Sequence, residues 1–83
     1  MRRLNDSKKR VLAIIKDIGR LNSITNRYEF DLHDLVYHRL AKQYTTDKVV
    51  SIVDSLIGIY VIKLIGHSKY SCDAKALEVL NEN

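Results

Sequence analysis

The spacing of apolar residues changes at Gly58, and this change restricts the fold more than any other feature of the chain. Before Gly58, apolar residues recur at helical spacing, as in Val49, Val53 and Leu56. After it, residues 59–65 are mostly β-branched or aromatic, which is typical of a strand. The chain contains no proline, so we expect its helices to be uninterrupted. The pattern predicts a mostly helical α+β fold.

The length and the cysteine content limit what such a fold can hold. A chain of 83 residues has room for one domain, so we expect a single unit over residues 1–83. Its one cysteine, Cys72, excludes an intrachain disulfide framework and a Cys-rich zinc site. No apolar stretch approaches the roughly 20 residues that span a bilayer. No apolar region follows Arg2 and Arg3, as it would in a secretory signal. We therefore expect an intracellular, cytoplasmic protein.

The local patterns predict four helices and a hairpin. The helices are expected over residues 7–21, 31–42, 46–57 and 74–81, with N-caps at Asp31, at Thr45 or Thr46, and at Asp73. Residues 22–29 are expected to form a loop that becomes a very short strand around 28–30. Strands at 59–65 and 70–72 would flank a turn at 66–69. About three or four residues separate the second and third helices, which forces a tight helix-turn-helix corner.

This order of elements resembles a winged helix-turn-helix domain. The run TTDKVVSIVDSL at residues 45–56 resembles the recognition helix of that family, and GIYVI at 58–62 resembles the exit from that helix into the first wing strand. The run YSCDAKALEVL at 70–80 resembles the second wing strand and the closing helix. The resemblance covers nearly the whole chain. It implies a three-helix core, a short β-hairpin wing and a C-terminal helix, in a sequence-specific double-stranded DNA-binding protein that regulates transcription. Small chains rich in Ile, Lys and Tyr and without proline resemble regulators from archaea and their viruses.

The charge is concentrated in the first half of the chain. Residues 1–48 hold eleven Lys or Arg and six acids, a balance of +5, and residues 49–83 hold three and four, a balance of −1. The sum is the net charge of +4. A basic half on a small domain favours a polyanionic partner such as nucleic acid. The alternative is that the charge only keeps the protein soluble.

The third predicted helix has an outward side that suits a DNA groove. If Val49, Val53 and Leu56 face the core, small polar residues and one lysine face outward. When such a helix enters the major groove of DNA, its N-terminal part lies nearest the bases. Phosphate contacts are expected from basic residues near the helix corner, from the turn between the wing strands and from the N-terminal basic residues acting as an arm. The predicted DNA-binding residues are Thr46, Lys48, Ser51, Ser55, Arg27, Arg39, Lys42, His67 and Lys69, and the arm is Arg2, Arg3, Lys8, Lys9 and Arg10.

The residues that commonly carry catalysis or bind metals are not arranged for either task. His33 and His38 are five apart, a spacing that does not place two ligands on one helix face. Cys72 is expected to be a small core thiol. The three glycines are isolated, so there is no glycine-rich loop for a nucleotide. We expect a non-enzyme with no metal, no cofactor and no small-molecule substrate.

Two questions remain open at this point. The first concerns the apolar stripes of the terminal helices. They favour a homodimer, which would match a palindromic DNA site. The alternative is that both stripes pack onto the core of the monomer. The second concerns function. Asp47 and Asp54 lie on or near the predicted reading side, which favours a protein–protein adaptor on the same fold. A nonspecific architectural DNA-binding protein is the third alternative.

Overall fold

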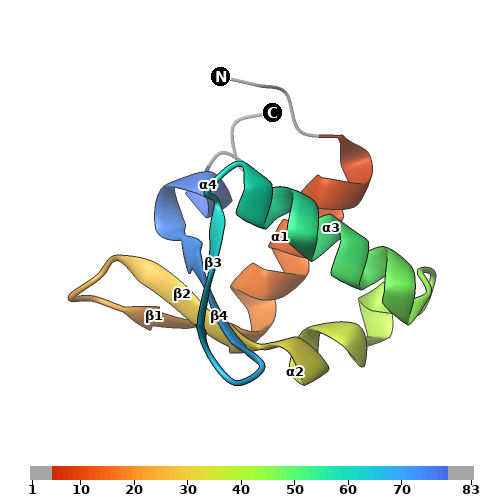
Figure 1. The fold of residues 1–83 in the computed structure, drawn as a ribbon, viewed down its shortest axis with the longest axis horizontal. Coiled ribbons are helices and arrows are strands. Elements are labelled where there is room, and N and C mark those ends of the chain that lie inside the picture. The colour runs from red at the N-terminus through yellow and green to blue at the C-terminus, as the bar shows by residue number, and fades with distance from the viewer. Residues whose placement is uncertain (1–4, 79–83) are drawn as a thin grey trace.

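The computed structural model describes residues 5–78, which form an α+β fold, as the sequence predicts (Figure 1). These residues contain four α-helices, a short 3-10 helix and one antiparallel sheet of four strands in the order β1-β2-β4-β3. None of the described helices is long and apolar enough to cross a membrane.

Helix α1 (Asp6–Ile18) begins at Asn5, whose side chain accepts a hydrogen bond from the backbone N–H of Lys8. Its apolar stripe, which includes Val11 and Ile15, is fully buried. The prediction that this helix continues to residue 21 is wrong. The backbone becomes extended at Gly19, where an added Cβ would lie 2.7 Å from the carbonyl oxygen of Ile15.

Strands β1 (Arg20–Asn22) and β2 (Arg27–Asp31) form a hairpin where the sequence predicted a loop and one very short strand. The side chain of Asn22 organises its tip by accepting hydrogen bonds from the backbone N–H groups of Ile24 and Thr25. Asn26 adopts a left-handed conformation with φ of 56°, which asparagine tolerates better than most residues. Leu21 continues the helical spacing of apolar residues in α1, and for this reason the sequence assigned Arg20 and Leu21 to the first helix and did not reveal β1.

The expected second helix over residues 31–42 is shorter than predicted and interrupted. Helix α2 (Leu32–Val36) begins at the predicted N-cap Asp31, and a separate 3-10 helix, η1 (Arg39–Ala41), follows. The break lies at His38, which has an extended backbone. The Nδ1 atom of His38 accepts a hydrogen bond from the N–H of Leu40, and its Nε2 atom lies 2.9 Å from the carboxylate of Asp17 on α1. His38 therefore caps η1 and joins this corner to α1.

Helix α3 (Thr46–Gly58) matches its prediction closely. Thr45 is the N-cap, and Val49, Val53 and Leu56 are buried, as expected, together with Ile52. After its end the backbone N–H groups of Tyr60 and Val61 donate to the carbonyls of Ile57 and Leu56, which is the hydrogen-bond pattern of a Schellman motif. This C-terminal turn occupies residues 59–61, so the following strand begins later than the sequence predicted.

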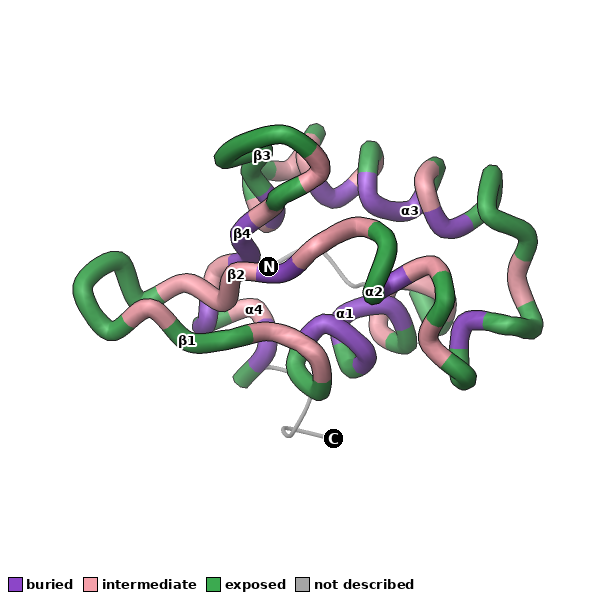
Figure 2. Tube along the Cα trace, turned by 90° about the horizontal axis from the view of Figure 1, so that it is seen from below, coloured by how far each residue is buried: buried purple, intermediate pink, exposed green. Residues whose placement is uncertain are grey.

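Strands β3 (Ile62–Gly66) and β4 (Lys69–Asp73) form the predicted hairpin, and β4 also pairs with β2. Asp73 accepts a hydrogen bond from the N–H of Lys75 at the start of α4 (Ala74–Glu78). The predicted extension of this helix to residue 81 lies outside the described residues. The core joins the inner sides of α1 and α3 to sheet residues such as Phe30 and Cys72, and Figure 2 shows the buried segments along these facing sides.

Candidate nucleic-acid interface

The side chains on the outward side of α3 are mostly polar and small. Thr46, Lys48 and Ser51 are exposed, as the sequence predicts. Ser55 is half-buried, and its hydroxyl donates a 2.7 Å hydrogen bond to the carbonyl of Ile52 within the helix. The same helix also exposes two carboxylates, Asp47 and Asp54, whose negative charge outweighs that of its one lysine.

Three cations flank the turn that leads into α3. Arg39 lies in η1, Lys42 follows it directly, and Lys48 lies in the first turns of α3; we call these three residues the basic corner. All three are exposed. Within residues 5–78 the ion pairs are His33–Asp31 and His38–Asp17, so no described carboxylate lies within 4.0 Å of the basic corner. These side chains are available to an external anion.

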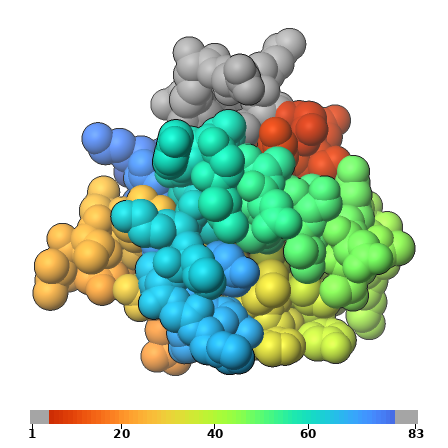
Figure 3. Space-filling view, in the orientation of Figure 1, coloured from red at the N-terminus to blue at the C-terminus, as the bar shows by residue number. Residues whose placement is uncertain are grey.

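The β3–β4 hairpin lies on the same face of the molecule as α3 (Figure 3), and the ribbon shows the same arrangement. Its tip contains His67, which is exposed, and Ser68, whose φ is 61°. The carbonyl of Ser68 accepts a 2.9 Å hydrogen bond from the backbone N–H of Leu32. The tip is therefore tied to the start of α2, which holds the hairpin in a fixed position beside α3.

Three apolar side chains of β3 and of the turn before it, which we call the apolar strip, are exposed, and sequence reasoning missed this exposure. The strip consists of Tyr60, Leu64 and Ile65, which are 88%, 59% and 46% exposed. The run over residues 59–65 predicts a strand, but its high apolarity, interrupted only by Lys63, does not show that β3 lies at the edge of the sheet. Only the position of β3 in the strand order reveals this exposure.

Arg27 is engaged inside the protein. Its Nε atom donates a 2.8 Å hydrogen bond to the hydroxyl of Ser71, and its terminal nitrogen donates to the carbonyls of Ser71 and Val61, each at 3.2 Å. These bonds tie β2 to β4 and to the segment before β3. A DNA contact by Arg27 stays a prediction, and these hydrogen bonds do not favour it.

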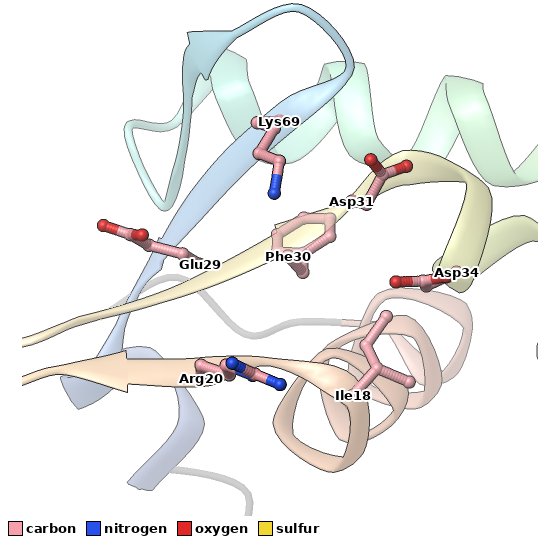
Figure 4. Close-up of a pocket in the computed structure, with 7 residues that line it drawn as sticks. All are labelled: Ile18, Arg20, Glu29, Phe30, Asp31, Asp34 and Lys69. Carbon is pink, nitrogen blue, oxygen red and sulfur yellow. The ribbon is translucent and has the colours of Figure 1, made fainter.

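Lys69 lies at the start of β4, directly opposite Asp31 in the strand register. The backbone N–H of His33 bonded to Asp31 lowers the pKa of that carboxyl, and the charge of Lys69 lowers it further. Lys69 also lines a groove between β2 and the ends of α1 and α2 (Figure 4). Of the predicted arm, Lys8, Lys9 and Arg10 belong to α1, whereas residues 2 and 3 lie outside the described residues.

The groups considered for catalysis and metal binding have structural roles. Cys72 is fully buried, and burial raises the pKa of its thiol from 9.0 to about 12 although the charge of Arg27 acts in the opposite sense. The thiol is therefore protonated at neutral pH. His33 and His38 each pair with a different aspartate. In the part of the chain that the structure describes, no three His, Cys, Asp or Glu side chains gather closely enough to hold a metal ion.

The structure thus gathers three of the predicted residues around the turn before α3 and places Thr46 and Ser51 on the exposed side of that helix. His67 and Lys69 lie in the hairpin, and Arg27 is turned into the sheet. No protein-family model, no curated protein and no solved structure matches this chain.

Proposed function

We propose that this chain is a winged helix-turn-helix protein that binds double-stranded DNA in a sequence-specific way and regulates transcription. One observation carries the proposal: β2, which lies between α1 and α2 in the chain, pairs with β4, the second strand of the hairpin that follows α3. This connectivity sets a hairpin beside an exposed helix that follows a tight corner. Strand β1 is an addition at the edge of the sheet.

In the proposed complex α3 enters the major groove, which is wide enough for one helix and displays a distinct pattern for each base pair. Thr46, Lys48, Ser51 and Ser55 lie on the side that faces the bases, and the N-terminal end of α3 comes closest. The basic corner contacts phosphates, which supply much of the affinity. His67 and Lys69 contact the backbone from the hairpin. These roles require binding and no covalent chemistry, in keeping with a protonated, buried Cys72.

A two-fold pair of chains belongs to the same proposal, because two copies would match a palindromic site with half-sites one DNA turn apart. The apolar stripes of α1 and of the described part of α4 are buried against the core, as at Leu12 and Leu77. In this pair the second copy binds the exposed side of α1, which carries Arg10, Lys16 and Asp17.

The proposal is tested by fluorescence anisotropy of the full chain with labelled duplex DNA at low salt, first with random sequence and then with a site selected from a random library. We expect tighter binding to the selected site. Replacing both Lys48 and Ser51 by Ala should weaken that binding by roughly 10- to 100-fold, in line with the 1–3 kcal/mol typical of a specific contact. Lys75→Ala, an exposed lysine on α4 outside the proposed DNA and α1 contacts, is the matched control and should leave affinity nearly unchanged.

Two results would contradict this proposal: no binding to any duplex at low salt, or binding that the Lys48 and Ser51 changes leave intact. Equal affinity for selected and random DNA would instead identify a nonspecific architectural protein, for which the salt dependence accounts for nearly all binding.

A second candidate, a protein–protein adaptor, is favoured by the composition of the same face. The apolar strip beside α3, together with Asp47 and Asp54, provides exposed apolar area and acidic groups that phosphate would repel. An adaptor predicts that a protein partner is recovered with the wild-type chain and lost with Leu64→Ser, while duplex DNA fails to bind.

A further inference from the structure

A groove with a volume of about 510 Å³ lies between the end of α1, strand β2 and the start of α2 (Figure 4). This volume falls within the range of roughly 300–1,000 Å³ that is usual for small-molecule sites. Residues from five elements line the groove: Ile18, Arg20, Glu29, Phe30, Asp31, Asp34 and Lys69. The groove lies apart from the outward side of α3 and shares only Lys69 with the proposed DNA contacts.

The groove exists because β1 is shorter than β2. Strand β1 pairs only with Arg27–Glu29, whereas Phe30 and Asp31 pair with β4 alone. At Gly19 the chain turns from α1 into β1, so no strand covers the last part of β2 on this side. The floor of the groove is rigid, because Phe30 is 4% exposed and its ring stacks on Tyr70 at a centroid distance of 5.8 Å.

Charges of both signs surround this floor, and they do not pair with one another. The register places Arg20 opposite Glu29 and Lys69 opposite Asp31, yet within residues 5–78 neither cation lies within 4.0 Å of a carboxylate. Asp34 has no hydrogen-bonded partner among the described side chains, whereas Asp31 accepts bonds from His33. Figure 4 shows Lys69, Arg20 and Asp34 reaching toward the region around Phe30 from three different elements.

We propose that this groove binds a small zwitterion with an apolar body, of the class of the free aliphatic α-amino acids. The carboxylate of the ligand is held by Arg20 and Lys69, its ammonium group by Asp34, and its side chain lies on the half-buried Ile18, beside the buried ring of Phe30. A polyanion does not fit, because Glu29, Asp31 and Asp34 would repel it. A wholly apolar ligand does not fit either, because it would strip water from charged groups without replacing their contacts.

The test is an NMR titration of the full ¹⁵N-labelled chain with L-leucine and three analogues. We expect saturable shifts for amides around the groove, including Phe30 and Lys69. N-acetyl-L-leucine lacks the ammonium group, 3-methylbutylamine lacks the carboxylate and glycine lacks the apolar side chain. The first two analogues leave a charged group of the groove unpaired, and glycine buries no apolar side chain, so each should bind at least about 10-fold more weakly.

Variants identify the site independently of DNA binding. Arg20→Gln and Asp34→Asn should each weaken L-leucine binding by about 5-fold or more, whereas Lys75→Gln on α4 should not change it. Melting temperatures of all three variants show that each remains folded. The proposal is overturned if L-leucine produces no saturable shift at about 10 mM, far above a useful affinity. It is also overturned if the analogues bind as well as L-leucine, or if the two groove variants bind like the Lys75 control.

Discussion

At the scale of single residues, Tyr60 has an unusual backbone conformation for a large side chain. It occupies the C′ position of the Schellman motif after α3, with φ of 66°, where glycine is the common residue. A left-handed backbone is unfavourable by roughly 1–2 kcal/mol for an L-residue. The ring is 88% exposed, so packing contributes little in return.

Tyr60→Gly should therefore raise the free energy of unfolding by about 0.5–1 kcal/mol, after the greater entropy of glycine in the unfolded chain is included. Urea denaturation measures this gain. Tyr60→Ala is the matched control: it removes the ring but keeps the strained backbone, so stability should stay nearly constant. A large loss with Ala and no gain with Gly would show that the ring packs against the protein.

The burial of the Cys72 thiol predicts that the folded protein loses stability at alkaline pH. Its thiol has a pKa of about 12 in the folded protein against 9.0 when exposed, so above pH 9 the unfolded chain releases a proton that the folded chain retains. This contribution to stability is complete below pH 9 and is lost as the pH rises from 9 toward 12. The expected loss between pH 7 and pH 10.5 is about 2 kcal/mol.

Urea denaturation as a function of pH, compared between the wild type and Cys72→Ala, isolates this effect, because lysines and tyrosines titrate equally in both. The wild type should lose stability more steeply above pH 9. Parallel curves would contradict the burial of the thiol, as would rapid labelling of Cys72 by iodoacetamide in the folded protein at pH 8.

At the scale of secondary-structure elements, Arg27 joins three segments that are far apart in sequence. Its guanidinium spans from β2 to the hydroxyl and carbonyl of the buried Ser71 and to the carbonyl of Val61. Arg27→Met keeps the stem but leaves these acceptors unpaired, so the free energy of unfolding should fall by about 2–3 kcal/mol. Thermal or urea unfolding measures the change.

Arg20→Met is the matched control for Arg27, because Arg20 lies in the neighbouring strand, is exposed and donates no hydrogen bond to a described residue. Its effect should stay within about 0.5 kcal/mol. Arg27→Lys should be intermediate, since a single ammonium cannot reproduce the planar fork. Equal effects of the Arg27 and Arg20 changes would show that the three hydrogen bonds do not stabilise the fold.

The accuracy of the sequence-based predictions varied with how each element is stabilised. Helix α3 was predicted well because its Thr45 cap and its buried Val49 and Val53 are all visible as a local pattern. Strand β1 and the break at His38 depend on hydrogen bonds to the side chains of Asn22 and His38. The spacing of apolar residues does not reveal such hydrogen bonds. The role of Arg27 was also hidden, because its partners lie 34 and 44 residues away in sequence.

At the scale of the whole molecule, the net charge of +4 is not spread evenly over the surface. On the sheet the cross-strand register places Arg20 opposite Glu29, Arg27 opposite Asp73 and Lys69 opposite Asp31, so three of the four cations of the described strands face an acid, whereas Lys63 faces Ser71. The basic corner has no such counterpart among residues 5–78. This contrast could not be read from the sequence, where the same residues only add to a basic first half.

The basic corner therefore gives a quantitative prediction for DNA binding that also counts the copies on the DNA. Each phosphate neutralised by a lysine contributes about −0.9 to the slope of log K against log salt concentration. If Lys42 contacts phosphate, Lys42→Gln should make the slope less steep by about 0.9 for one bound copy and by about 1.8 for a two-fold pair on a palindromic site. Anisotropy titrations between about 50 and 200 mM salt measure this change. Lys75→Gln removes the same charge from α4, outside the proposed DNA and α1 contacts, and should leave the slope unaltered. An unchanged slope for Lys42→Gln would show that Lys42 in the basic corner does not contact phosphate. It would not contradict the proposed contacts of α3, which the Lys48 and Ser51 changes test.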